Sequence, residues 1–128
     1  MKTSIAHTLA VGAAALCLAA GAARADQFDT IKANGTLKCG IAQNYVPFSF
    51  IEDPKTRQMV GYDVEVCDAI AKEIGVKPEH VFITGATRIT DLQQGRTDIA
   101  LAALTNNPER ARIIDFSYNY MGTGVKIA

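Results

Sequence analysis

The sequence predicts an α/β domain in which a mostly parallel sheet is flanked by helices. Apolar, strand-like segments alternate along the chain with segments of helical periodicity, which is the pattern of repeated βαβ units. One segment, Asp98–Leu104 (DIALAAL), is almost continuously apolar, as expected of a central strand covered on both faces. Hydrophobic residues make up 48% of the 128 residues and charged residues 20%, which suits one domain with its own core.

The first 25 residues have the features of a cleaved export signal. Lys2 is followed by an apolar stretch over residues 9–20, which is too short and too rich in alanine for a membrane span. Ala23-Arg24-Ala25 supplies the small-x-small pattern of a signal peptidase site. We therefore expect residues 1–25 to be a signal peptide cut after Ala25, and the mature protein to reside in the periplasm.

The first third of the mature chain predicts a short helix followed by three strands. Asp29 is the expected N-cap of the helix, and Gly35 is its expected C-terminal stop. Pro47 lacks a backbone donor, so residues 43–47 are expected to form a loop. The predicted strands are Thr36–Ala42, Phe48–Glu52 and a short one around Met59-Val60.

The rest of the chain continues with helices and strands in alternation. The clearest helix follows Gly61 and ends at Gly75, because Val64, Cys67, Ile70, Ala71 and Ile74 recur at three- and four-residue spacing. We expect next a strand at residues 81–83, a brief helix through Ile89 and Leu92, and the strand 98–104. A helix should follow, with Asn107 as its N-cap and Pro108 at its first position, and then a strand over residues 122–128.

Composition excludes several classes of function. Lys and Arg total 13, as do Asp and Glu; removing residues 1–25 takes away Lys2 and Arg24 and no acidic residue, which leaves a net charge of −2. A nucleic-acid binder normally has a basic surplus. His80 is the one histidine after residue 25, and no Cys or His cluster has metal-ligand spacing, so we expect no metal site and no cofactor.

The strongest candidate for a binding site is the segment Thr105-Asn106-Asn107-Pro108-Glu109-Arg110. Ligands of open α/β sheets bind beyond the carboxyl ends of the strands, and this segment follows the apolar strand. A helix start offers free N–H groups, Thr105 a hydroxyl, and Arg110 a guanidinium that can bind a carboxylate with two hydrogen bonds. The plainer interpretation is that Asn107 caps a helix and Arg110 is solvated.

Two further residues are candidates for the same site. Tyr45 lies on a loop just past a strand end, where its ring can stack on the aliphatic part of a ligand, whereas Phe48 is expected in the core. Arg88 begins a short helix beyond another strand end and can meet an acidic or polar ligand group, although a lone arginine on a turn is commonly solvated.

Cys39 and Cys67 are the two cysteines of the mature chain. Export makes a disulfide between them chemically feasible, and both can equally be buried thiols. Buried thiols are slightly favoured, because packing between a strand and a helix usually leaves the Cα atoms too far apart for the bond.

No catalytic set is evident. Ser49 and Ser117 have no histidine near them in sequence, and His80 has no evident carboxylate to orient it. Asp63, Asp91 and Asp98 are interpreted as caps and surface residues.

Several motifs, taken in order, resemble the family 3 solute-binding proteins, which serve ABC importers of polar amino acids. The matching segments are residues 35–40 (GTLKCG), 45–50 (YVPFSF), 60–65 (VGYDVE), 88–89, 92–98 (LQQGRTD), 105–110 (TNNPER), 115–117 and Tyr120. The resemblance covers nearly all of the mature chain. It implies a lobe of the type II periplasmic-binding-protein fold, a clamp of two lobes that closes on an amino acid, and an ABC permease as partner.

The resemblance also assigns roles. It implies that Arg110, with Thr105, grips the ligand's α-carboxylate and that Tyr45 forms an aromatic wall. The α-amino group would be met at Ala102-Ala103, here only by main-chain carbonyls. Family members that bind basic amino acids carry an acidic residue at the position of Ala42. Arg88 and the Thr-Asn-Asn stretch are similar to the branch that binds glutamate and aspartate. The resemblance therefore favours an acidic or amide amino acid as ligand.

Length is the main departure from this family. Its members continue through a second lobe, so residues 26–128 are expected to be a truncated first lobe that binds weakly, if at all. The competing hypotheses are an enzyme on the same scaffold, resembling the periplasmic cyclohexadienyl dehydratases, and a receptor's sensor domain, which would need a membrane span.

Overall fold

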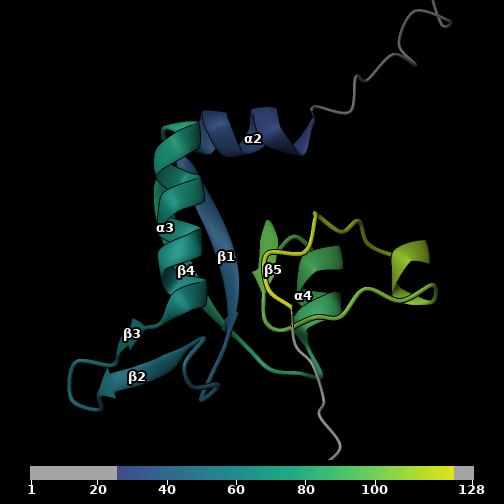
Figure 1. The fold of residues 1–128 in the computed structure, drawn as a ribbon. Helices are drawn as coiled ribbons and strands as arrows, with labels where there is room; N and C mark the ends of the chain where they lie inside the picture. Colours follow the sequence, from purple (N-terminus) through teal and green to yellow (C-terminus); the bar gives the residue numbers. More distant parts are fainter. Residues whose placement is uncertain (1–25, 123–128) are drawn as a thin grey trace, which may run out of the picture.

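The computed structural model describes residues 26–122, and its main sheet has three parallel strands (Figure 1). The elements in chain order are α2 (Gln27–Asn34), β1 (Thr36–Ala42), β2 (Phe50–Asp53), β3 (Gln58–Val60), α3 (Tyr62–Ile74), β4 (Lys77–Ile83), α4 (Arg88–Gln93), β5 (Ile99–Leu101) and the 3-10 turn η2 (Arg110–Arg112). The sheet order is β4-β1-β5, and β2 and β3 form a separate antiparallel pair. The expected signal peptide and nearly all of the strand expected over residues 122–128 lie outside the described residues.

The register of the sheet follows from β1, which pairs with both neighbours. Thr36 to Ala42 pair with Lys77 to Ile83 of β4, and Cys39 to Ile41 pair with Ile99 to Leu101 of β5. Figure 1 shows α3 on one side of β1 and α4 on the other. The prediction of a parallel sheet flanked by helices is therefore confirmed, and it is β1, not β5, that lies in the centre of the described sheet.

Helix boundaries are set by caps and glycines. The Asp26 side chain accepts a hydrogen bond from the Phe28 N–H, so the N-cap of α2 lies three residues earlier than predicted and Asp29 is within its first turn. Gly35 and Gly75 end α2 and α3 with φ of 65° and 75°, a conformation that glycine adopts without strain.

Gly61 fits α3 against the loop before β2. Its φ is 127°, and a Cβ at this position would lie 2.4 Å from the Phe48 carbonyl oxygen. The close approach lets the Asp63 N–H donate to that carbonyl at 2.8 Å. Glycine is therefore required here by both conformation and space.

The core lies between β1 and α3. It consists of Ile31, Leu37, Cys39, Ile41, Met59, Val64, Cys67, Ala71 and Leu101, each at most 9% exposed. Burying a large aliphatic side chain contributes roughly 1.5–3 kcal/mol, so this cluster is the main stabilising feature of the described residues.

Cys39 and Cys67 form a disulfide, so the preference for buried free thiols was wrong. Their Cα atoms lie 6.2 Å apart, within the range that a disulfide spans. Small residues bring the helix close, since Cys67 and Ala71 face β1 and both are fully buried. The bond joins the central strand to the main helix.

Two elements near the strand ends are shorter than predicted. The strand over residues 98–104 is reduced to Ile99–Leu101, and Ala103 has a φ of 48°, which ends extended pairing. The helix expected from Asn107 is a three-residue 3-10 turn, although the Asn107 side chain does accept a hydrogen bond from the Arg110 N–H at 2.8 Å. No helix within residues 26–122 has the length and apolar character needed to cross a membrane.

Candidate binding site at the strand ends

Three loops meet at one edge of the sheet. Because β1, β4 and β5 are parallel and in register, their carboxyl ends lie together. The loop after β1 carries Tyr45, the turn after β4 leads to Arg88, and the segment after β5 carries Ala103 and Thr105. This is the edge at which open α/β sheets bind ligands.

A cavity of about 600 Å³ lies beside these loops. Tyr45, Ala103 and Thr105 line it, so three residues predicted from the sequence share one cavity. Residues 114–122 also line it. The volume is of the size that holds a small metabolite.

Arg110 lies next to this cavity. Its Nη1 donates to the Thr105 carbonyl oxygen at 2.9 Å, and its main-chain N–H is fixed by Asn107. Arg110 does not itself line the cavity, because its guanidinium folds back onto the main chain at Thr105. A guanidinium has five N–H donors, so this contact leaves capacity for a carboxylate.

Arg88 extends from the start of α4 to the backbone after β5. Its Nη1 donates to the carbonyl oxygens of Ala102, at 2.9 Å, and Ala103, at 3.4 Å. Burial is the largest cause that lowers the pKa of Arg88. The neighbouring positive charge of Arg110 lowers this pKa further, whereas Tyr45 raises it. All five predicted site residues therefore gather at the strand ends.

The Ala103 carbonyl already has a partner. The expectation from the resemblance was that main-chain carbonyls here meet a ligand's α-amino group. An ammonium at this position would share the oxygen with Arg88. Arg88 thus acts on the site indirectly, by holding the main chain at Ala102 and Ala103 in place.

A row of aromatic rings borders the cavity, and sequence reasoning found only its first member as a site residue. Tyr45 and Phe48 have ring centroids 5.3 Å apart, Phe48 and Tyr62 6.4 Å, and Tyr62 and Tyr120 6.1 Å. Phe48 is half-buried and lines the cavity, so its assignment to the core was wrong. The aromatic residues near Pro47 and Asp63 were the available signal, but their pairing depends on the tertiary fold.

Asp63 joins α3 to the segment after β5, and sequence reasoning interpreted it as a cap or surface residue. It is fully buried, and its Oδ1 accepts a hydrogen bond from the Tyr120 hydroxyl at 3.1 Å, while Oδ2 has no partner among the described residues. Burial raises the pKa of Asp63 against the lowering effect of that bond. Burial and the adjacent carboxylate raise the pKa of Tyr120, which keeps its proton for donation.

Asp91 and Asp98 also have structural partners. Asp91 is buried and paired with Arg96, and hydrogen bonding from Thr87 is the largest cause that lowers its pKa. Asp98 Oδ2 accepts from the Lys38 N–H at 2.8 Å, which ties β5 to β1. Both carboxylates thus make structural contacts, and Asp98 also lines the strand-end cavity.

His80 lies away from this cavity, within β4. Its Nε2 is 2.8 Å from Asp68 Oδ1, so the expectation that His80 has no carboxylate partner was wrong. The two residues are twelve apart and meet because α3 packs on β4. The strand-end cavity is lined by aromatic rings and by Thr105, and the guanidinium groups of Arg88 and Arg110 lie beside it, a set suited to holding a small anion.

Comparison with known proteins identifies relatives of this chain. The chain is 31% identical over 104 residues to an L-glutamate/L-aspartate-binding protein of Pseudomonas aeruginosa, covering 76% of this chain and 34% of that protein. It is 34% identical over 85 residues to a probable histidine-binding protein of Campylobacter jejuni, covering 66% and 32%. The chain thus spans about a third of the length of the curated relatives it matches.

Solved structures agree with these relatives. The ancestral amino-acid-binding protein AncCDT-1, a precursor of cyclohexadienyl dehydratase, is 42% identical with a TM-score of 0.71, over 76% of this chain and 42% of that one. The arginine-bound form of domain 1 of the T. maritima protein ArgBP is 30% identical with a TM-score of 0.67, over 72% and 71%. Residues 37–128 match the family described as bacterial extracellular solute-binding proteins, family 3. The chain belongs to this family.

Proposed function

We propose that this chain carries one lobe of an extracytoplasmic binding site for an amino acid, which it delivers to an ABC permease. The observation that carries the proposal is the position of Arg110, Thr105 and Tyr45 at one strand-end site. In this proposal residues 1–25 are a leader cut after Ala25, residues 26–128 belong to the first lobe, and the protein acts in the periplasm.

The α-carboxylate of the ligand binds Arg110 and the Thr105 hydroxyl. A bidentate guanidinium–carboxylate pair is strong and directional, and the partly enclosed site excludes part of the competing water. The ring of Tyr45 covers the ligand's aliphatic atoms, and Phe48 supports that ring.

The ligand is an acidic or amide amino acid. The guanidinium of Arg110 is close enough to that of Arg88 for its positive charge to lower the pKa of Arg88. A ligand with a second carboxylate or an amide oxygen relieves this repulsion, whereas a lysine or arginine side chain adds to it. A relative named as binding glutamate and aspartate supports this choice.

A single lobe can hold ligand in this family. One relative is described as the arginine-bound form of domain 1, and it is matched over 71% of its length. Its described ligand is a basic amino acid, so it supports binding by one lobe and not the ligand class.

The test is calorimetric titration of the purified chain with glutamate, aspartate, glutamine, asparagine, lysine, arginine and histidine. We expect saturable heat with the first four, and loss of it in Arg110→Lys, which keeps the charge but not the fork of donors. Preference for lysine or arginine would contradict the ligand class. Equal binding by the Arg110→Lys variant would contradict the site.

A dehydratase on the same scaffold is the second candidate. An ancestral cyclohexadienyl dehydratase is 42% identical with a TM-score of 0.69, over 76% of this chain and 39% of that one. Incubation with prephenate, with product detected by absorbance, distinguishes the two: loss of water and carbon dioxide would support the enzyme, and an unchanged substrate the binding protein.

A further inference from the structure

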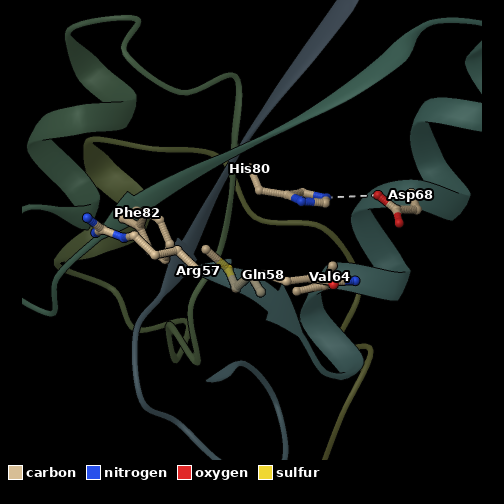
Figure 2. A pocket seen from close by; sticks show the side chains of 7 residues that line it. Arg57, Gln58, Val64, Asp68, His80 and Phe82 are labelled. Atoms are coloured by element: carbon tan, nitrogen blue, oxygen red, sulfur yellow. Dashed lines mark hydrogen bonds and ion pairs between the residues drawn. The ribbon is translucent and has the colours of Figure 1, made fainter. Parts of the chain in front are cut away.

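A second cavity, of about 410 Å³, lies over the side of β4 that faces α3 (Figure 2). Its lining residues are Arg57, Gln58, Met59, Val64, Asp68, His80 and Phe82. None of them lines the strand-end cavity, so the two are separate. The proposed amino-acid site therefore gives this second cavity no role.

Three groups able to bind a metal ion converge at the wall of this cavity. One donor atom each from Cys67, Asp68 and His80 lie within 4.8 Å of one another. Zinc ligands lie about 2.0–2.3 Å from the ion, so in a tetrahedral site they are roughly 3.3–3.8 Å apart. The three atoms need only small shifts to surround one ion.

The fold dictates this convergence. Cys67 and Asp68 are neighbours on α3, and His80 is the register partner of Cys39, whose sulfur is bonded to Cys67. Partners in a parallel ladder direct their side chains to the same face of the sheet. The disulfide and the His80–Asp68 pair therefore lie next to each other between α3 and the sheet.

We propose that reduction of the Cys39–Cys67 disulfide converts this cluster into a binding site for a divalent transition metal such as Zn²⁺. While the bond is intact, the sulfur of Cys67 carries no thiolate and the ion lacks its third protein ligand. Cys67, Asp68 and His80 then bind the ion, and water or the freed Cys39 sulfur completes the tetrahedron.

The chemistry balances with a dithiol as reductant. A thiolate of the dithiol attacks one sulfur of the disulfide and releases the other; its second thiol then closes a disulfide in the reductant. Two electrons and two protons pass to Cys39 and Cys67. On binding, the ion displaces the Cys67 thiol proton, which goes to solvent. It takes the place of the hydrogen bond between His80 Nε2 and Asp68 Oδ1, and the ring then carries its proton on Nδ1, so the ring releases no net proton.

The ion has a route into the site. The Asp68 side chain is 51% exposed and that of His80 27%, whereas Cys67 is fully buried. Figure 2 shows the His80–Asp68 pair at one end of the group and the Arg57 guanidinium beside Phe82 at the other. The nearby cation therefore lies away from the proposed ligands.

The test uses Cys39→Ser, which leaves the Cys67 thiol free without any reductant. Titration with Co²⁺, followed by displacement with Zn²⁺, should give a thiolate-to-cobalt charge-transfer band at one ion per chain. Its matched control is Cys67→Ser, which keeps one free thiol at Cys39 but removes the central ligand. We expect affinity at least roughly tenfold lower in the control, and in Cys39→Ser chains that also carry His80→Gln or Asp68→Asn.

A second measurement uses the wild-type chain, so the test does not depend on how well the variants fold. Zn²⁺ should raise the melting temperature of the chain reduced with a phosphine, and leave that of the oxidised chain unchanged. Equal metal affinity in Cys39→Ser and Cys67→Ser, or an equal zinc effect on the oxidised and reduced chains, would overturn the proposal. These results do not depend on amino-acid binding.

Discussion

The two sides of the sheet hold their residues in different ways. On the α3 side, a disulfide and a buried apolar cluster fix the helix on β1. On the strand-end side, loops carry the site, and Arg88 and Arg110 hold them through hydrogen bonds to main-chain carbonyls. A rigid half thus supports a half built from polar contacts, and a ligand can replace those hydrogen bonds with its own at little cost in free energy.

Removal of the disulfide tests the rigid half and should have the largest effect. The Cys39→Ala, Cys67→Ala double variant loses the cross-link that closes a segment of 28 residues. Loop-closure entropy predicts a loss of about 3–4 kcal/mol in the free energy of unfolding. Urea unfolding measures it, with Ser117→Ala, an exposed residue outside the core, as the control. A loss below about 1 kcal/mol would show that the apolar cluster alone fixes α3.

Arg110→Lys tests the polar half. The variant should bind the preferred amino acid roughly tenfold or more weakly, about 1.4 kcal/mol, because the ammonium lacks the planar fork. Unfolding free energy should change by less than about 0.5 kcal/mol, as for surface changes in general. Calorimetry and urea unfolding on the same samples separate the two. A large stability loss with unchanged affinity would reverse the roles assigned to the two halves.

The pH dependence of the unfolding free energy tests the junction between the two halves, which Asp63 forms with Tyr120. Its folded pKa is raised, so the folded chain binds this proton more tightly than the unfolded chain does. The stabilising contribution is present below the ordinary pKa of 3.8 and is lost as pH rises through the higher folded value.

Asp63→Asn should remove this contribution, because an amide does not titrate. We expect the unfolding free energy of wild type relative to the variant to fall from pH 4 to pH 7, because the raised pKa of Asp63 makes ionisation costly in the folded chain. Urea unfolding at both values measures it, with Asp53→Asn as a control. A parallel pH profile in wild type and variant would contradict the shift.

His80→Gln should have the smallest effect. The pair with Asp68 is partly exposed, so its loss in the oxidised chain should cost less than about 0.5 kcal/mol. Thermal unfolding with the disulfide intact measures it. A loss above about 1 kcal/mol would mean that His80 supports the packing of α3, and the same variant would then be a poor control for metal binding.

Periodicity predicted the fold well where a face is buried. The strand β1 has the predicted ends, and α3 lies between the predicted glycines, because both face the core. The strand after Asp98 was predicted too long, since alanine-rich apolar sequence does not reveal that Ala103 turns into the left-handed region. The disulfide was missed for a related reason: helix-to-strand distance depends on small neighbours such as Ala71, which spacing does not encode.

The site was predicted in part. Tyr45, Arg88, Ala103, Thr105 and Arg110 were found because strand ends mark where ligands bind, and the structure brings them together; their roles toward a ligand stay predictions. The Asp63–Tyr120 and Asp68–His80 pairs were missed because their members are 57 and 12 residues apart and meet only through packing. The same is true of the proposed metal site.

Pro78 in β4 limits self-association of the sheet. The Lys77 N–H points toward β1, where it donates to the Gly35 carbonyl at 3.0 Å, so the next nitrogen, that of Pro78, faces the opposite way. A donor is thus absent on the outer margin of the sheet and not within the ladder. Lys77 and Glu79 place charges on either side of it. A second chain that adds as a β-strand at this margin meets a gap in the hydrogen-bonding row, which disfavours edge-to-edge pairing there.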